Sequence, residues 1–286
     1  MTHVIMVVLV TNDDGYQADG ITTLEKKLVE SGHEVWLCAP TSERSAQSHA
    51  MTFHGKVTFV RYDERHYHCS GSPADCVLYG LGGKALPVIP DVVISGINHG
   101  YNASTDILYS GTVGAASEAA LRGYPAIAIS ARRDRQTNVY PFEEAAQFLV
   151  DNLPWLMSYC TSEVILNINV PPRPNGQWRV GMLGHLEYFD FMESSSSKKK
   201  TSYDVSATKL GLAYGNANHL SAIGEEVTLS LSNHVPPELK QEDPEVDYRL
   251  LSRGYISVTP LSVHPAVDFE TAQELRARLA KGQNYG

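Results

Sequence analysis

Short apolar runs alternate with segments of helical periodicity along the first 170 or so residues. Ile5 to Val10 is a continuous apolar run, which predicts a strand covered on both faces. Apolar residues then recur at three- and four-residue spacing from Ile21 to Ser31, which predicts a helix closed by Gly32. Glu34 to Cys38 is a second apolar run, ended by alanine and proline. A strand, a helix and a strand in this order predict a parallel pair joined by a right-handed crossover.

The alternation continues as far as the prolines at positions 171 and 172. The further helices predicted in this part are Pro73 to Leu81, Gly111 to Leu121 and Pro141 to Leu153. The further strands lie within Val57 to Tyr67 and at Asp91 to Ser95, Ala126 to Ser130 and Val164 to Val170. Strands that alternate with helices predict a doubly wound, mostly parallel α/β sheet. We therefore expect a Rossmann-like, three-layer core over residues 1–172.

The remaining residues, 173–286, carry a more β-rich pattern. Val227 to Leu231 and Tyr255 to Thr259 predict strands, and Glu270 to Ala280 predicts a terminal helix. Glu193 to Lys200 is rich in serine and lysine, which predicts an exposed loop or hairpin tip. We expect a C-terminal extension, part of which returns to the core.

Composition narrows the classes of partner. The 286 residues are 43% hydrophobic and 19% charged, which is typical of a globular protein with a sizeable core. The formal net charge is −9 and no basic patch dominates, which argues against a nucleic-acid polymer as partner. A small anionic ligand remains compatible with this charge, because a bound cation reverses the local field.

The sequence also bears on where the protein works. No apolar stretch approaches the ~18 residues that cross a bilayer, and Met1 to Val10 lacks both a basic start and a cleavage site. The four cysteines form no C-x-x-C pair, so neither disulfides nor a zinc–thiolate site is expected. We expect a cytoplasmic protein with no membrane partner.

Two adjacent carboxylates follow the first predicted strand, in the motif Asn12-Asp13-Asp14-Gly15. In open α/β sheets, ligands bind outside the carboxyl ends of the strands. Adjacent carboxylates repel each other unless a proton or a cation compensates, and Mg²⁺, Mn²⁺ and Ca²⁺ select oxygen ligands. The alternative is a simple turn with side-chain hydrogen bonds, since asparagine, aspartate and glycine are all turn residues.

Polar loops also follow the second and third predicted strands. Ser95 to Gly100 contains Asn98, whose carbonyl oxygen could bind a metal, and His99, which could be a ligand or a proton donor. Arg44 to His49 contains serine hydroxyls that could reach a metal or a phosphate. The alternatives are a tight turn for the first loop and a solvated loop for the second.

A small-residue segment, Ser110 to Gly114, opens the alanine-rich helix. Helix N-termini expose unpaired N–H groups with a positive partial charge, and small residues let a phosphate approach them. The alternative is that the serine or the threonine of this segment acts only as an N-cap. Neither G-K-[ST] nor G-x-G-x-x-G occurs at the expected place, which argues against a Walker A loop and a dinucleotide site. Together, these loops predict a metal-plus-phosphate site at one edge of the sheet.

At this point the motifs resemble those of a known family, the stationary-phase survival proteins SurE, which are metal-dependent 5′/3′-nucleotidases. The similar stretches span nearly the whole chain in order: Leu9 to Ile21, Ala39 to His49, Gly71 to Val77, Pro90 to Asn102, Asp106 to Ala120, Asn167 to Pro171 and Gly254 to Leu261. The segment from Glu187 to Asp247 departs from the family pattern. The resemblance implies hydrolysis of nucleoside 5′-monophosphates, and of 3′-monophosphates as a further substrate, to nucleoside and phosphate.

The resemblance also implies a set of site residues and an assembly. One divalent cation per subunit, Mg²⁺ or Mn²⁺ with Ca²⁺ a further candidate in crystals, would be held by Asp13, Asp14, Ser45 and Asn98. The phosphate would be bound by Asn102, Ser110, Gly111 and Thr112. The residues implied in catalysis are Asp13, Asp14 and Asn98. The implied assembly is a homodimer or homotetramer in which C-terminal elements are exchanged between subunits.

Three other functions remain open from the residues alone. A phosphoenzyme could form on Asp13, although the common motif for that chemistry spaces its two aspartates differently. A non-catalytic stress protein could bind a nucleotide or an anion in the same place. The chain could also serve as an oligomeric scaffold through its C-terminal arm.

Overall fold

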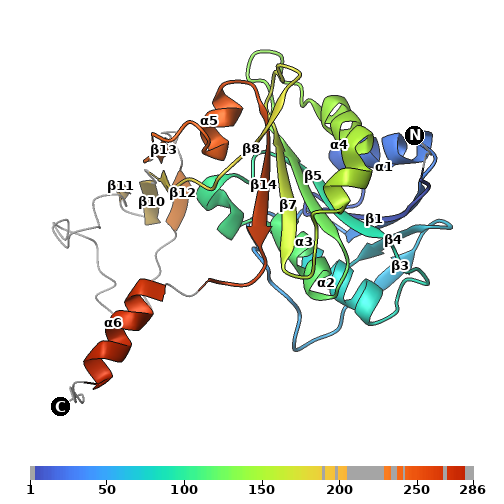
Figure 1. Cartoon of the computed structure of the whole chain (residues 1–286), viewed down its shortest axis with the longest axis horizontal. Helices are drawn as coiled ribbons and strands as arrows, with labels where there is room; N and C mark the ends of the chain where they lie inside the picture. The colour runs from blue at the N-terminus through green and yellow to red at the C-terminus, as the bar shows by residue number, and fades with distance from the viewer. Residues whose placement is uncertain are drawn as a thin grey trace.

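A single large sheet forms the centre of the computed structural model, which describes residues 4–188, 191–196, 199–204, 229–232, 237–240, 242–266 and 269–280. Its nine strands follow the order β3-β4-β2-β1-β5-β6-β7-β14-β8, with helices on both faces (Figure 1). The predicted doubly wound, mostly parallel α/β fold is confirmed.

The strands of this sheet place several carboxyl ends side by side. In chain order they are β1 (Val7–Thr11), β2 (Glu34–Pro40), β3 (Phe59–Arg61), β4 (His66–Cys69), β5 (Val92–His99), β6 (Ala126–Ala131), β7 (Val164–Val170), β8 (Trp178–Val180) and β14 (Ile256–Ser262). Strands β4, β2, β1, β5, β6 and β7 pair in parallel. The outer strand β3 runs antiparallel to β4, and β14 runs antiparallel to β7.

The described residues form six α-helices, four of which cover the two faces of the sheet in pairs. They are α1 (Asp19–Glu30), α2 (Pro73–Val77), α3 (Gly111–Leu121), α4 (Phe142–Met157), α5 (Asp247–Ser252) and α6 (Phe269–Ala280), with a π-helical turn η1 (Leu78–Gly82) and a 3₁₀ helix η2 (Ser104–Leu108). Helices α1 and α4 pack on one face, and α2 and α3 on the other. Each face of the sheet has its own hydrophobic core. In strand β1, Val8 and Val10 belong to the core beneath α1 and α4, and Leu9 belongs to the core beneath α2 and α3. This alternation follows because successive side chains of a strand point to opposite faces.

Several element boundaries differ from the sequence prediction. Strand β1 begins at Val7 rather than Ile5, which lies before the sheet and is 68% exposed. Strand β5 runs beyond Ser95 to His99, because its ladder with β6 resumes at Asn98 after a register shift. The single helix predicted from Pro73 to Leu81 divides into α2 and η1. Helix α4 continues through an internal proline to Met157, and the short strand β8 was not predicted.

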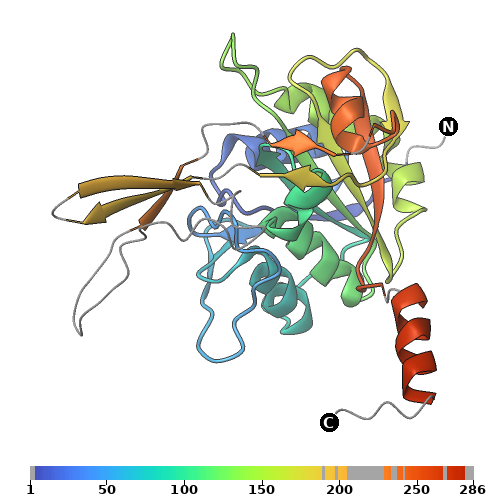
Figure 2. The same cartoon turned by 90° about the vertical axis from the view of Figure 1, so that its left-hand side faces the viewer.

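The C-terminal part adds two small sheets. They contain β9 (Leu186–Glu187) with β13 (Glu238–Leu239), and β10 (Phe191–Ser196) with β11 (Lys199–Asp204) and β12 (Leu229–Ser232). The serine-lysine run predicted as a loop or hairpin tip forms the end of the β10–β11 hairpin, with Ser196 opposite Lys199. Residues 197–198 and 227–228, on which parts of these predictions fall, lie outside the described residues. Figures 1 and 2 show this hairpin and α6 extending away from the main sheet.

A helix that crosses a bilayer is long and predominantly apolar. Among the described residues, no helix is long and apolar enough to cross a bilayer. The 16-residue helix α4, for example, carries Glu143 and Glu144 in its first turn.

Candidate functional site

A cavity of about 230 Å³ lies where the ends of β1, β2 and β5 meet the start of α3. Most of the predicted ligands line it: Asp13, Asp14, Ser45, Asn98, Asn102 and Ser110. The two predicted ligands that do not line it, Gly111 and Thr112, lie at the start of α3, where both approach Asp13. The topology therefore brings together loops that are far apart in the sequence.

A tight turn presents the two carboxylates. The Asn12 side chain accepts a hydrogen bond from the Gly15 backbone N–H at 3.1 Å and donates one to the Gly15 carbonyl at 2.8 Å. Gly15 has a φ of 103°, which a residue with a Cβ rarely adopts. The turn proposed as an alternative reading is thus present, but Asn12 and Gly15 form it. Asp13 and Asp14 are left to face the cavity.

Asp13 is a buried carboxylate, with 5% of its surface exposed. Its pKa is raised from 3.8 to about 6, mainly by burial and to a smaller extent by the nearby charge of Asp14. The Thr112 hydroxyl donates a 2.6 Å hydrogen bond to Asp13 Oδ1, which partly opposes these effects by stabilising the charged form. A cation beside Asp13 would also stabilise the charged form.

Asp14 is held by His99. The His99 backbone N–H donates to Asp14 Oδ2 at 3.1 Å, and the His99 ring Nδ1 lies 2.9 Å from Asp14 Oδ1. The hydrogen bond between the His99 ring and the Asp14 carboxylate raises the pKa of His99, and burial of the ring opposes this effect. The rings of Tyr140 and Phe142 pack edge-on against the imidazole, with centroids 4.9 and 5.1 Å away. His99 therefore orients Asp14.

Ser45 and Asn98 bring neutral oxygens to the same cavity. The Asn98 amide nitrogen donates to the Gly100 carbonyl at 3.1 Å, which fixes the orientation of its carboxamide. The Ser45 hydroxyl donates to Glu43 Oε1 at 2.6 Å. Glu43 also lines the cavity, so a third carboxylate faces the same space as the predicted pair.

Asn102 is fixed by the two neighbouring strands. Its backbone N–H donates to Asn169 Oδ1 at 2.9 Å, and its carbonyl accepts from Asn167 and Asn169 on β7 at 2.7 and 3.0 Å. Its side-chain nitrogen donates to the Ser130 hydroxyl on β6 at 2.9 Å. An amide nitrogen has two hydrogens, so one N–H remains for a ligand.

At the start of α3, an anion would meet backbone N–H groups, because the Ser110 and Thr112 hydroxyls already have hydrogen-bond partners. Ser110 caps the helix by accepting a 3.0 Å hydrogen bond from the Val113 N–H, and the Thr112 hydroxyl is engaged with Asp13. A Cβ added to Gly111 would lie 3.0 Å from both Cβ and Oδ2 of Asp13, so the glycine allows this close contact. The Val113 N–H is used in the Ser110 cap, so the N–H groups of Gly111 and Thr112 are the first-turn donors for an anion.

Replacing Thr112 with valine tests the contact between α3 and Asp13. Valine has nearly the same shape but no donor, so the pKa of Asp13 should rise above its present value of about 6. A hydrogen bond to a charged group contributes about 1.5 kcal/mol, which corresponds to about one pH unit in the pKa, so Mn²⁺ affinity should fall about tenfold at pH 5 and about twofold at pH 7. Calorimetric titration with Mn²⁺ measures this affinity. The control is Thr22→Val on α1, because the Thr22 hydroxyl donates only to backbone carbonyls at the start of its own helix. An unchanged affinity would show that this hydrogen bond does not influence the site.

The far side of the cavity was not predicted as functional. Asp106 and Tyr109, which lie in and just after η2, line the cavity together with Ala46. Burial raises the pKa of Asp106, whose Oδ1 accepts a 2.5 Å hydrogen bond from the Tyr188 hydroxyl. Asp106 and Tyr109 fall within the SurE-like stretch from Asp106 to Ala120, but no spacing in that stretch indicates their position.

Residues of the C-terminal part fasten η2. The Ser104 backbone N–H donates to Asp247 Oδ2 at 2.7 Å, and the Ser104 hydroxyl donates to the other oxygen of the same carboxylate. The Gly184 N–H donates to the Ser104 hydroxyl at 3.1 Å, and the Leu186 N–H donates to the Thr105 hydroxyl at 2.8 Å. One wall of the cavity therefore depends on contacts across 143 positions of sequence.

The donor set fits a hard divalent cation. In the part of the chain that the structure describes, no group of three or more His, Cys, Asp or Glu side chains could hold a metal ion. The candidate set combines only two carboxylates with a hydroxyl and an amide, so it is not of that kind. All four donors are oxygens, as Mg²⁺ and Mn²⁺ prefer.

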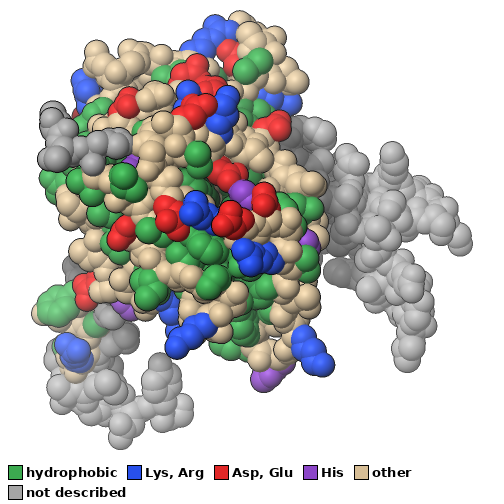
Figure 3. All heavy atoms as spheres, turned by 90° about the vertical axis from the view of Figure 1, so that its right-hand side faces the viewer, with side chains coloured by type: hydrophobic (Ala, Val, Ile, Leu, Met, Phe, Trp, Pro, Cys, Tyr) green, Lys and Arg blue, Asp and Glu red, His purple; other side chains and the backbone are tan. Residues whose placement is uncertain are grey.

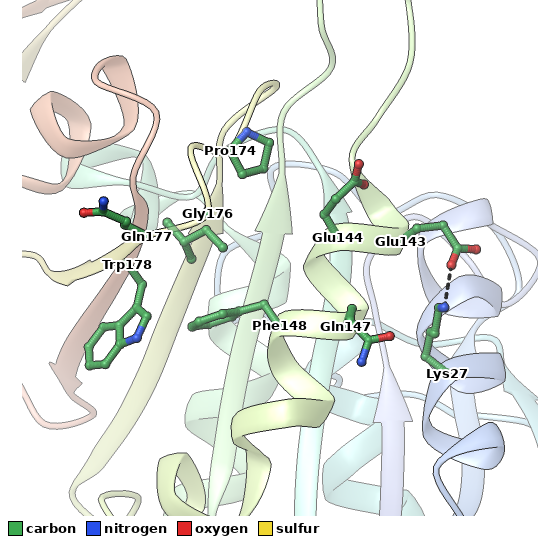
Figure 4. Close-up of a pocket in the computed structure, with 10 residues that line it drawn as sticks. Lys27, Glu143, Glu144, Gln147, Phe148, Pro174, Gly176, Gln177 and Trp178 are labelled. Atoms are coloured by element: carbon green, nitrogen blue, oxygen red, sulfur yellow. Dashed lines mark ion pairs between the residues drawn. The ribbon is translucent and has the colours of Figure 1, made fainter.

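A larger cavity, of about 590 Å³, lies between α4 and residues 174–178 (Figure 4). Phe148 and Trp178 line it, with an ion pair between Lys27 and Glu143 at 3.0 Å at one end. None of the motif residues lines it. Figure 3 shows acidic and basic side chains interspersed on the face that looks right in Figure 1, without a basic stripe. Most of the candidate site residues line the smaller cavity, so that cavity is the candidate site.

The sequence matches the family model described as Survival protein SurE over residues 8–189. The chain belongs to the SurE family. This match includes every candidate site residue, from Asp13 to Thr112. The family expected from the sequence motifs is therefore confirmed.

Similar SurE proteins extend the match over nearly the whole chain. The 5′-nucleotidase SurE of Desulfitobacterium hafniense is 35% identical over 281 residues, covering 96% of this chain and 98% of that protein. The 5′-nucleotidase SurE of Synechococcus elongatus is 36% identical over 265 residues, covering 90% and 93%. The crystal structure of the SurE protein from Aquifex aeolicus superposes with a TM-score of 0.71 at 26% identity, covering 95% and 98%.

Proposed function

We propose that this chain is a divalent-metal-dependent phosphomonoesterase that hydrolyses nucleoside 5′-monophosphates, and 3′-monophosphates as well, to nucleoside and phosphate. The observation that carries the proposal is that Asp13 and Asp14 share one cavity with the N-terminal end of α3. Paired carboxylates are suited to a cation, and a helix start is suited to a phosphate. Membership of the SurE family, with relatives named 5′-nucleotidase, supports the same activity.

The proposed cation ligands are Asp13, Asp14, Ser45 and Asn98, with one Mg²⁺ or Mn²⁺ per subunit. Such a cation supplies Lewis acidity toward the phosphoryl oxygens. The protein's own part is to hold the two carboxylates in place. The Thr112 hydroxyl does so for Asp13, and His99 does so for both oxygens of Asp14.

The phosphate group is proposed to lie against Asn102, Ser110 and the N–H groups of Gly111 and Thr112. These donors are fixed before substrate arrives, because β6 and β7 hold Asn102 and the helix holds the others. Preorganised donors stabilise charge that develops on the phosphoryl oxygens without a reorganisation cost. They also orient the phosphorus for attack by water, after which the nucleoside leaves with a proton.

Metal removal tests the activity directly. Release of inorganic phosphate from AMP should occur with Mn²⁺, stop when EDTA is added, and return when Mn²⁺ is supplied in excess. A sugar phosphate without a base and an unphosphorylated nucleoside are the comparison substrates. If AMP binds without release of phosphate under all these conditions, the chain is a nucleotide-binding protein and the proposed function is wrong.

The assembly is proposed to be a homodimer or homotetramer with exchanged C-terminal elements. Helix α6 extends away from the sheet, and Phe269 at its start is 65% exposed (Figure 2). We also propose residues 1–172 as the catalytic core and 173–286 as the extension that carries the contacts between subunits. Strands β8 and β14 of this extension pair with each other, and β14 pairs with β7 of the core.

A further inference from the structure

Glu118 is a buried carboxylate on α3 that does not line the proposed site. Its side chain is 1% exposed, and a buried charge is costly unless it is paired and hydrogen-bonded. Both of its oxygens have partners: His49 Nε2 lies 2.9 Å from Oε2, and Arg122 Nη2 and Nε lie 2.7 Å from Oε1. Burial alone would raise the pKa of Glu118, but these partners lower it overall. The carboxylate therefore stays ionised where it meets His49.

His49 ends the segment that carries Ser45 into the cavity. This segment, residues 44–49, lies directly on α3, since a Cβ added to Gly114 would stand 2.6 Å from the Ser48 carbonyl oxygen. Ala46 and Ser48 have positive φ values of 56° and 53°. For residues with a side chain, such a conformation is disfavoured and persists only where the surroundings hold it.

The contacts that hold this segment come from two sides of the cavity. The Ser48 N–H and hydroxyl donate to the carbonyls of Tyr109 and Leu108 at 2.9 and 2.8 Å. His49 donates to, or shares a proton with, Glu118 farther along α3. The other end of the segment is bonded to the turn that carries the carboxylates, because the Arg44 N–H donates to the Asp13 backbone carbonyl at 2.7 Å.

Helix α3 thus contacts both halves of the proposed ligand set. In its first turn, the Thr112 hydroxyl donates a hydrogen bond to the Asp13 carboxylate. Farther along the helix, the Glu118 carboxylate is hydrogen-bonded to the His49 ring. We propose that His49 and Glu118 are a positioning pair that sets where the Ser45 hydroxyl lies relative to Asp13, and thereby the affinity for the divalent cation. This inference rests on the proposed function, since it takes Ser45 and Asp13 as ligands. Neither member of the pair lines the cavity itself.

Mn²⁺ titration of the full chain by calorimetry tests the pair without relying on turnover. His49→Ala should weaken Mn²⁺ binding about tenfold, the lower end of the range seen when a supporting partner of a ligand is removed. His49→Gln keeps a donor close to the position of Nε2 and should restore most of the affinity. His54→Ala, which changes an exposed histidine in the same region, is the matched control and should bind as the unmodified chain does.

A double-mutant cycle with Ser45 separates positioning from a general structural role. If His49 acts through Ser45, adding His49→Ala to Ser45→Ala should weaken binding no further. A tenfold loss in both backgrounds, or no loss in the single variant, would overturn the inference. Should His49→Ala unfold at the assay temperature, His49→Asn, whose amide is too short to reach Glu118, must show the same loss and the same cycle.

The outcome for Asp13 distinguishes this inference from the proposed function. If Asp13→Asn binds Mn²⁺ as tightly as the unmodified chain, the cation site itself is misassigned. If Asp13→Asn loses binding while the His49 variants keep it, the cation site stands and only the positioning pair is wrong.

Discussion

Replacing Asp13 with asparagine should abolish Mn²⁺ binding and lower kcat for nucleoside monophosphate hydrolysis by about 10³-fold, with the fold intact. The cation's stabilisation of charge in the transition state is worth several kcal/mol, and about 1.4 kcal/mol corresponds to a factor of ten. Asparagine keeps the shape of the side chain and an oxygen that accepts from Thr112. What it removes is the negative charge.

Stability in EDTA gives the control for this substitution. The cation-free protein holds a buried carboxylate next to Asp14, so removing its charge should leave the melting temperature unchanged or slightly higher. Asp151→Asn, on the exposed surface of α4, should change neither activity nor Mn²⁺ binding. Activity within tenfold of the unmodified chain in the Asp13 variant would remove Asp13 from the proposed mechanism.

Mn²⁺ affinity should fall by about tenfold for each pH unit below 6 and level off above pH 7. Burial raises the pKa of Asp13 to about 6, so the cation-free protein takes up a proton at this carboxyl as the pH falls through 6. A metal binds the deprotonated ligand, and each pH unit below the pKa reduces that form tenfold. Calorimetric titrations at pH 5, 6, 7 and 8 measure this, and Thr112→Val should move the midpoint to higher pH.

The same pKa predicts how stability depends on pH. The folded protein keeps a proton on Asp13 up to about pH 6, whereas the unfolded chain loses it near 3.8. Between these values the folded state binds more protons, so the cation-free protein loses stability as the pH rises, by about 3 kcal/mol in total. Mn²⁺ should therefore raise the melting temperature more at pH 7.5 than at pH 5. An equal rise at both values would show that Asp13 does not titrate in this way.

The local sequence pattern predicted most of the central fold, because the periodicity that indicates a helix or a strand is set by residues close together in the chain. Helix α3 and strand β7 have the predicted boundaries, Gly111–Leu121 and Val164–Val170. The prediction was wrong where long-range contacts decide. Ile5 continues the apolar run of β1 but lies before the ladder with β2 begins, and the short strand β8 exists only through its pairing with β14.

The site followed from topology, but its internal contacts did not. Polar loops after parallel strands could be expected to converge, and Asp13, Ser45 and Asn98 do line one cavity. The hydrogen bond from Thr112 to Asp13 joins residues 99 positions apart, so no local pattern indicates it. Glu43 and Asp106 were not predicted as site residues, because an isolated acidic residue is usually solvated.

The fastening of η2 by Asp247 has a consequence for how the enzyme is made. The carboxylate turn and the start of α3 are complete once the first half of the chain has been synthesised, but the wall that bears Asp106 gains its anchor only with residue 247. A nascent or prematurely terminated polypeptide would thus possess the acidic half of the cavity while its opposite side is unsupported. Catalytic competence would arrive only after residue 247 has been translated.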